Sequence, residues 1–197
     1  MMRAESAGRG LQAPLFEQLI RSLDEDRRHV VMDCGAARSG TIALLSELRC
    51  RLDILDLAQC LPELGGLEDP GERRACLAEC LPGSGREPVD LVFCWNLLNY
   101  LKPADIETVG KLLSPLLKPG ARLHALIEYS SPLMPASPGH WVPDASARLF
   151  ADQVDLDQIP SPRYSPKKLQ SLMPQFQPEK TMLLGNGLQE HLFRMRL

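Results

Sequence analysis

Two short stretches carry the residue types best suited to binding a ligand. The first, residues 33–40, contains Asp33, Gly35 and Ala37, and its small side chains let a backbone approach a ligand at the start of a helix. The second ends at Asp56, after another short apolar run. An acid about 20 residues beyond such a turn, at the tip of the next strand, suits the two hydroxyls of a ribose. The spacing therefore predicts a cofactor that contains a nucleoside.

Alternating apolar and amphipathic segments are expected to position these residues. Buried parallel strands are predicted at 29–34, 51–56, 89–94 and 122–129. Helices are predicted at 13–23, from Ser39 or Thr41 to about 49, at 104–117 and at 166–172. Two further runs, 181–184 and 189–195, flank Gly185-Asn186-Gly187 and predict a closing antiparallel hairpin.

The segment between the second and third of these strands allows two interpretations. Asp69, Pro70 and Glu72 form a helix start, which predicts a helix over 70–81. A short strand at 75–79 is the alternative. Asp56 also has a second interpretation, as the N-cap of a helix over 57–64.

Three landmarks together carry a resemblance to a known family: the turn at 33–40, the strand and polar segment at 88–101, and the turn at 116–123 containing Lys118-Pro119-Gly120. Because these landmarks have the order and spacing typical of that family, the chain resembles the class I S-adenosylmethionine-dependent methyltransferases over roughly residues 28–197. The resemblance implies an α/β, Rossmann-like doubly wound fold, with a mostly parallel sheet and a C-terminal antiparallel hairpin. We expect a disordered N-terminus at 1–10 and a single domain over 11–197, with a proline-rich insertion at about 130–166.

The same resemblance implies S-adenosylmethionine as cofactor and S-adenosylhomocysteine as product. The implied cofactor-binding residues are Asp33, Gly35, Ala37, Asp56 and Asn96. Ala37 and Ser39 replace the second and third glycines of the family pattern, and the Cβ of Ala37 is expected to intrude on the cofactor side of the turn. The acid that contacts adenine after the family's third strand has only a weak counterpart, Glu79.

Four residues are candidates for contact with a methyl acceptor: Tyr100, Glu128, His140 and Trp141. Tyr100 and Glu128 follow strands at the edge where open α/β sheets bind ligands. For Glu128 the alternative is a solvated strand end. His140 and Trp141 lie in the insertion, which we expect to form a mobile cover over the site; a solvent-exposed histidine is the alternative there.

Composition excludes some partners and leaves others open. The net charge of −3 gives no electrostatic reason to expect nucleic acid or an anionic membrane, and no apolar run is long enough to span a bilayer. The six cysteines lack metal-ligand spacing, so we expect no metal and free thiols, in a cytoplasmic protein. The predicted partner is a small-molecule acceptor or a protein, and the oligomeric state is left open.

Two functions from different classes therefore stand side by side. One is methyl transfer from S-adenosylmethionine to an acceptor, where the protein mainly supplies proximity and orientation. The other is a non-catalytic, methyltransferase-like binding or scaffold protein, which the altered turn favours. An NAD-binding oxidoreductase also fits the strand-turn-helix-acid unit, but the closing hairpin argues against it.

Overall fold

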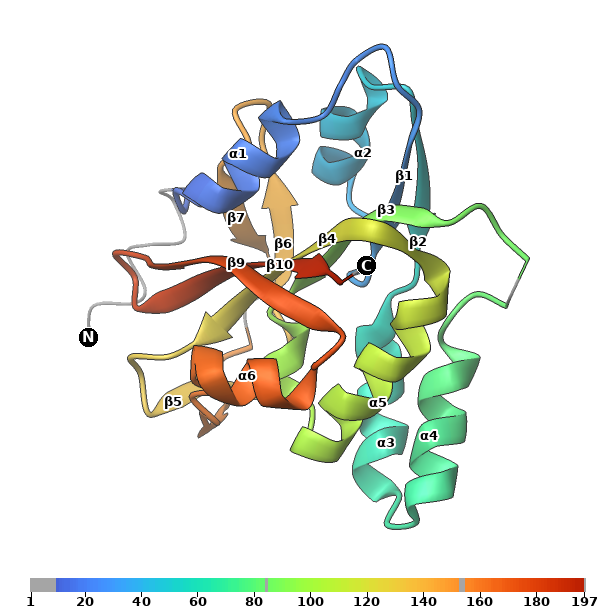
Figure 1. Cartoon of the computed structure of the whole chain (residues 1–197). Coiled ribbons are helices and arrows are strands. Elements are labelled where there is room, and N and C mark those ends of the chain that lie inside the picture. Colours follow the sequence, from blue (N-terminus) through green and yellow to red (C-terminus); the bar gives the residue numbers. More distant parts are fainter. Residues whose placement is uncertain (1–9, 84, 153–154, 197) are drawn as a thin grey trace.

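The computed structural model describes residues 10–83, 85–152 and 155–196. Within these ranges a six-stranded sheet has the order β2-β1-β3-β4-β10-β9 (Figure 1). Its parallel part comprises β1 (His29–Asp33), β2 (Cys50–Ile54), β3 (Val89–Trp95) and β4 (Leu117–Glu128). The strands β9 (Phe176–Leu183) and β10 (Leu188–Met195) form the antiparallel hairpin that closes the sheet. The predicted fold class is confirmed.

Helices cover both faces of this sheet. The α-helices are α1 (Pro14–Arg21), α2 (Ser39–Ser46), α3 (Leu61–Gly66), α4 (Pro70–Glu79), α5 (Pro103–Leu113) and α6 (Pro166–Leu172). Single 3-10 turns follow β2 (η2, Leu57–Cys60), β3 (η3, Leu97–Tyr100) and α5 (η4, Ser114–Leu116). Figure 1 shows α1 and α2 on one side of the sheet and α3, α4, α5 and α6 on the other.

The alternation of side chains along the central strands explains the two layers. Val30 and Met32 of β1 belong to the cluster with α3 to α6, whereas Val31 and Phe93 belong to the cluster with α1 and α2. All four side chains are fully buried. A strand buried on both faces is continuously apolar, which is why this run could be recognised from sequence.

The uncertain segment between β2 and β3 is helical. α4 begins where the sequence predicts, because the carboxylate of Asp69 accepts the backbone N–H of Glu72 at 2.9 Å. The alternative strand at 75–79 is therefore wrong. Among the described residues 55–83 and 85–88 no strand follows β2, so β2 is the edge of the sheet and the implied third strand is missing.

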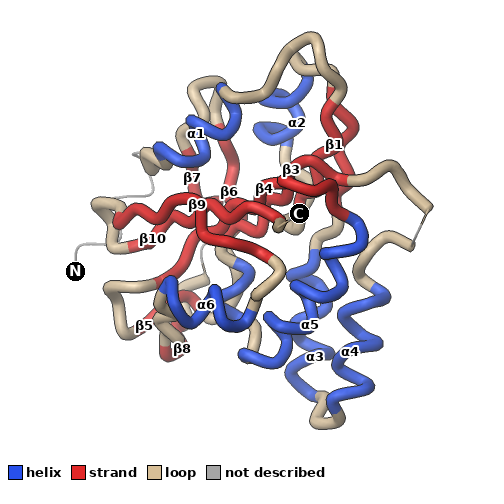
Figure 2. The backbone as a smooth tube through the Cα atoms, viewed as in Figure 1, coloured by secondary structure: helices blue, strands red, loops and turns tan. Residues whose placement is uncertain are grey.

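The proline-rich insertion has more regular structure than predicted. It contains β5 (Leu133–Pro135) paired with β8 (Gln158–Pro160), and β6 (His140–Pro143) paired with β7 (Leu149–Asp152). Figure 2 shows these strands outside the central sheet, with β6 and β7 on the side of α1. Leu149 is fully buried and exchanges two backbone hydrogen bonds with Leu11, so the second hairpin is packed against the body of the protein.

A buried polar pair anchors α1 to the sheet. The carboxylate of Glu190 accepts the backbone N–H groups of Leu15 and Phe16 at 2.9 and 2.7 Å and lies 2.9 Å from His124 Nε2. The imidazole and the carboxylate come from β4 and β10, two strands that are distant in the chain. The expected disorder at 1–10 falls on residues 1–9, which lie outside the described residues, and on Gly10.

None of the described helices is long and apolar enough to cross a membrane.

Candidate functional site

The two stretches singled out by sequence lie together at the carboxyl edge of β1 and β2. The Asp56 N–H donates to the Gly35 carbonyl at 3.2 Å, and the Leu57 N–H donates to the Cys34 carbonyl at 2.9 Å. Asp56 has φ of 45° in the left-handed region, which costs energy for a residue with a side chain. Asp56 holds the N-cap position of η2, as the alternative interpretation predicted, but its carboxylate makes no cap hydrogen bond and instead accepts Gln59 Nε2 at 2.7 Å.

Asp33 ends β1 inside the turn, and one oxygen of its carboxylate accepts two hydrogen bonds there. Oδ1 accepts the Gly35 N–H at 2.8 Å and the Trp95 indole N–H at 2.6 Å. The side chain is buried, and burial raises its pKa to about 6, although the two hydrogen bonds oppose the rise. The nearby charge of Asp56 adds to it. Asp33 thus orients the turn from within.

Trp95 occupies the space directly in front of the glycine turn. A Cβ built on Gly35 would lie 2.8 Å from Trp95 Cδ1, so only glycine allows this contact. Trp95 itself has φ of 47°, and a bulky aromatic in the left-handed region is a true outlier. The ring also packs 5.4 Å from Phe16 and 5.3 Å from Phe93. Strained backbone therefore occurs at the tips of both β2 and β3, which flank the site.

A small cavity of about 20 Å³ remains at this edge. Its walls come from the Gly35 turn, from the end of β3 with Trp95 and Asn96, and from residues 138–141 of the insertion. One water molecule needs about 10–15 Å³ by this measure, so the cavity has room for little more than one water. Trp95 and residues 138–141 therefore cover the carboxyl edge of β1 and β2 and leave no room there for a ligand larger than water.

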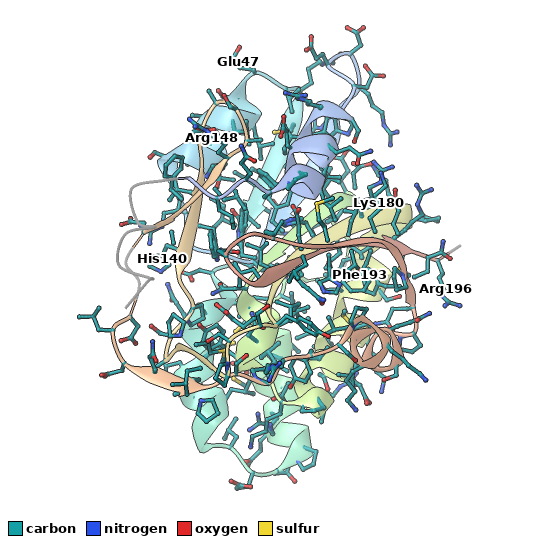
Figure 3. The ribbon with its side chains drawn as sticks, turned by 90° about the vertical axis from the view of Figure 1, so that its left-hand side faces the viewer. Glu47, His140, Arg148, Lys180, Phe193 and Arg196 are labelled. Carbon is teal, nitrogen blue, oxygen red and sulfur yellow. The ribbon has the colours of Figure 1, made fainter. Side chains whose placement is uncertain are left out.

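The β6–β7 hairpin produces this closure by packing on the start of α2. A Cβ on Gly40 would collide with the carbonyl of Pro143, which shows how closely the hairpin approaches the helix. Arg38, immediately before α2, contacts His140 Nδ1 and lies 3.8 Å from a carboxylate oxygen of Asp152. Figure 3 shows His140 and Arg148 on this hairpin, His140 toward its base and Arg148 toward its tip.

The closed arrangement leaves polar atoms unpaired where hairpin and helix meet. Arg38 Nε, Thr41 Oγ1 and Trp141 Nε1 are buried and have no hydrogen-bond partner among the described residues. A buried polar group without a partner costs about 1–3 kcal/mol. These three atoms are therefore groups that a polar ligand at the junction of the hairpin and α2 could satisfy.

Two buried thiols, Cys34 and Cys94, also line the cavity. The pKa of Cys34 is raised well above its ordinary value because its thiol shares a hydrogen bond with Cys94 and is buried. A thiol with a raised pKa is protonated at neutral pH and is a weak nucleophile. No group of three or more metal-ligating side chains is found in the part of the chain that the structure describes.

Six of the nine predicted site residues lie at this edge: Asp33, Gly35, Asp56, Asn96, His140 and Trp141. Of these, Gly35, Asn96, His140 and Trp141 line the cavity itself. Ala37 is exposed and lies outside the cavity lining, so its Cβ does not intrude on that space. Glu79, the weak adenine candidate, is exposed at the end of α4.

Tyr100 and Glu128 take structural positions beside the insertion. The Tyr100 hydroxyl lies 3.1 and 2.9 Å from the carbonyl oxygens of Pro135 and Ser137. Glu128 is buried, so the interpretation as a solvated strand end is wrong; its N–H donates to Asn99 Oδ1 and its carbonyl accepts Ser161 Oγ. Neither residue lines the cavity.

Sequence reasoning did not include Trp95 among the site residues. The ring is buried in the core, and it also covers Gly35 and donates its indole N–H to Asp33. A signal was present: a tryptophan directly after an apolar strand, at the edge that holds the glycine turn, has a polar N–H that needs a partner.

No family model and no curated protein sequence matches the chain. Solved structures do match. A 1,6-didemethyltoxoflavin-N1-methyltransferase from Burkholderia thailandensis, bound to S-adenosylhomocysteine, is 18% identical over 94% of this chain and 78% of that one, with a TM-score of 0.53. A SAM-dependent methyltransferase from Methanosarcina mazei is 14% identical over 94% and 99%, with a TM-score of 0.50. A glycopeptide N-methyltransferase complexed with S-adenosylmethionine is 10% identical over 94% and 87%, with a TM-score of 0.51. This chain therefore has the fold of the class I SAM-dependent methyltransferases.

Proposed function

We propose that this protein binds S-adenosylmethionine at the carboxyl edge of β1 and β2 and transfers its methyl group to a small-molecule acceptor. The observation that carries the proposal is the direct hydrogen bond between the Asp56 backbone and the Gly35 turn. It brings the acid suited to ribose hydroxyls beside the only glycine in residues 33–39. The cofactors bound in two structural neighbours support the same ligand.

The chemical types of the residues at this edge suit the cofactor, but the cavity between them is too small to hold it. Asp56 would take the ribose, and the Gly35 turn and Asn96 would lie beside the remainder. When bound, S-adenosylmethionine supplies an electrophilic methyl on a sulfonium, and the protein's part is to orient the acceptor and exclude water. The cavity of about 20 Å³ excludes this ligand in the closed arrangement. Binding therefore requires residues 138–141 and the Trp95 ring to leave the turn.

Two features favour such an opening. The backbone of Trp95 is strained, and three polar atoms at the junction of α2 and the hairpin have no hydrogen-bond partner among the described residues. In the opened site, His140 and Trp141 would face the cofactor from the hairpin, and we propose that they contact the acceptor. Tyr100, which holds Pro135 and Ser137, would support the base of the same cover.

The closed cavity, and the absence of a strand from the described residues 55–83 and 85–88, favour a second candidate function. In this alternative the chain keeps the fold but works as a binding or scaffold protein for a protein partner. Both observations concern the binding of the cofactor and not that of the acceptor. An experiment that measures cofactor binding therefore distinguishes the two candidate functions.

Calorimetric titration with S-adenosylmethionine, S-adenosylhomocysteine and NAD tests the proposal. We expect saturable binding of the first two ligands and no binding of NAD. Asp56→Ala should weaken binding by about 1–3 kcal/mol, the scale of a lost charge-assisted hydrogen-bond pair. Glu47→Ala is the matched control, because Glu47 is exposed beyond α2. Absence of heat with all three ligands at millimolar concentration would refute the proposal and favour the scaffold function.

A further inference from the structure

A second cavity lies at the opposite edge of the sheet. β1 runs from His29 to Asp33; the closed site is at the Asp33 end, and this cavity is at the His29 end. Its volume is about 240 Å³, an order of magnitude above that of the first cavity. The end of α1, the starts of β1, β3 and β4 and the end of β10 form its walls. The cavity therefore has room for a small molecule in the arrangement that the structure shows.

The walls of this cavity are strongly basic. Arg27, Lys118, Arg122 and Arg194 line it, from three segments that are distant in sequence. Asp90 is the single acidic residue in the lining. The chain as a whole has a net charge of −3, so this concentration of cations runs against its average. Clefts lined by one sign of charge attract ligands of the other sign.

Two carboxylates hold the four cations in place. Asp90 lies 2.9 Å from Arg27 Nη2 and 2.7 Å from Lys118 Nζ. Glu179, outside the lining, lies 3.3 Å from Arg122 Nε and 3.2 Å from Arg194 Nε. The pKa of Glu179 is lowered, since these two guanidinium groups outweigh the opposing effect of burial. Four cations against two carboxylates leave an excess of two positive charges.

An ion network that only ties the sheet together would balance its charges. Here the excess charge surrounds an open volume. Arg122 and Arg194 contact Glu179 through Nε, and Arg122 Nη1 also donates to Ser22 Oγ at 3.1 Å, while each guanidinium has five N–H donors. Gly120, in the lining, would direct a Cβ into open space. Arginine forks match the oxygens of phosphate, and lysine adds a point charge.

We propose that this second cavity binds a small phosphate-bearing anion. The excess of two charges suits a dianion such as a phosphate monoester. The inference is independent of the proposed function, because the cavity and the Gly35 turn lie at opposite ends of β1. Anion binding here and cofactor binding at the turn can therefore fail separately.

Titration with inorganic phosphate and pyrophosphate, followed by calorimetry and by thermal unfolding, tests the inference. We expect both to bind and pyrophosphate to bind more tightly. Lys118→Gln and Arg194→Gln should each weaken binding about fivefold to tenfold, allowing for partial solvent screening. Lys111→Gln is the matched control, because Lys111 is exposed on α5. Added sodium chloride should weaken binding in the wild type.

Glu179→Gln separates a binding site from a structural ion network. Removing this carboxylate frees Arg122 and Arg194 from their internal partner, so pyrophosphate affinity should rise about threefold even if the variant is less stable. Unchanged or weaker affinity in Glu179→Gln would overturn the inference, as would equal affinity in Lys118→Gln and wild type. Citrate binding as tightly as pyrophosphate would overturn the assignment to phosphate.

Discussion

The buried carboxyl of Asp33 should make a contribution to stability that falls as pH rises, which is opposite to the usual contribution of a carboxylate. Its pKa rises from an ordinary 3.8 to about 6, chiefly because burial disfavours the charged form. The folded state therefore binds a proton more tightly than the unfolded state does. The contribution of Asp33 is most favourable below the unfolded pKa and is lost as pH rises through the folded one. At about 1.4 kcal/mol per pKa unit, the loss is about 3 kcal/mol.

His191 has the opposite effect over nearly the same range. Burial lowers its pKa from 6.5 to about 4, and the nearby His124 adds to this, while Glu190 opposes it. The folded state keeps the ring neutral, so stability is present above the unfolded pKa and is lost as pH falls toward the folded one. The magnitude is again about 3 kcal/mol. In the wild type the two contributions should largely cancel between about pH 4 and pH 7.

Asp33→Asn is expected to remove the pH-dependent contribution of Asp33 to the free energy of unfolding and to leave that of His191. The amide oxygen of asparagine can accept from both Gly35 and Trp95, so the turn's hydrogen bonds are retained. Urea denaturation followed by far-ultraviolet circular dichroism should show this variant gaining about 3 kcal/mol relative to wild type as pH rises from about 4 to about 7. His191→Gln should show the reverse. A difference between Asp33→Asn and wild type that stays constant with pH would refute the reasoning.

Three further substitutions test the packing around the site and the sheet. Trp95→Phe keeps the ring in front of the turn but removes the N–H that Asp33 accepts, and urea denaturation should show a loss of about 1–3 kcal/mol. Asp69→Ala removes the N-cap of α4 and should cost about 1 kcal/mol, seen also as reduced helical circular dichroism. Asp105→Ala leaves the buried Arg73 guanidinium without its 2.6 Å partner, which should cost about 3–5 kcal/mol by the same denaturation assay. A loss as small as that of Asp69→Ala would contradict this, and would show that the Leu64 and Leu67 carbonyls, which also accept from Arg73, are sufficient partners.

The elements that the sequence predicted well are those with a local physical signal. β1 is a continuous apolar run, and α4 begins at a capping acid followed by proline, so each could be recognised without its neighbours. The βαβ spacing predicts Asp56 at the tip of the second strand, and its N–H donates to the Gly35 carbonyl there. The roles of the individual site residues in ligand binding stay predictions.

The unpredicted features depend on tertiary contacts. The partner of His124 lies 66 residues away on β10. The closure of the site depends on Gly40 meeting Pro143 and on Arg38 meeting His140, contacts that join a helix start to a hairpin with no periodicity of its own. Ala37 is exposed because of the orientation of the turn, and the local sequence alone does not determine that orientation.

Intrinsic tryptophan fluorescence offers the most direct test of the claim that a nucleoside cofactor binds at the turn by displacing the residues that close it. The chain has two tryptophans, and both Trp95 and Trp141 line the closed cavity. In Trp141→Phe, Trp95 is the sole reporter. Titration of this variant with S-adenosylhomocysteine should give a saturable change in Trp95 emission as the ring leaves Gly35, and Asp56→Ala in the same background should shift the midpoint to higher concentration. Emission that stays constant up to millimolar S-adenosylhomocysteine would contradict the account.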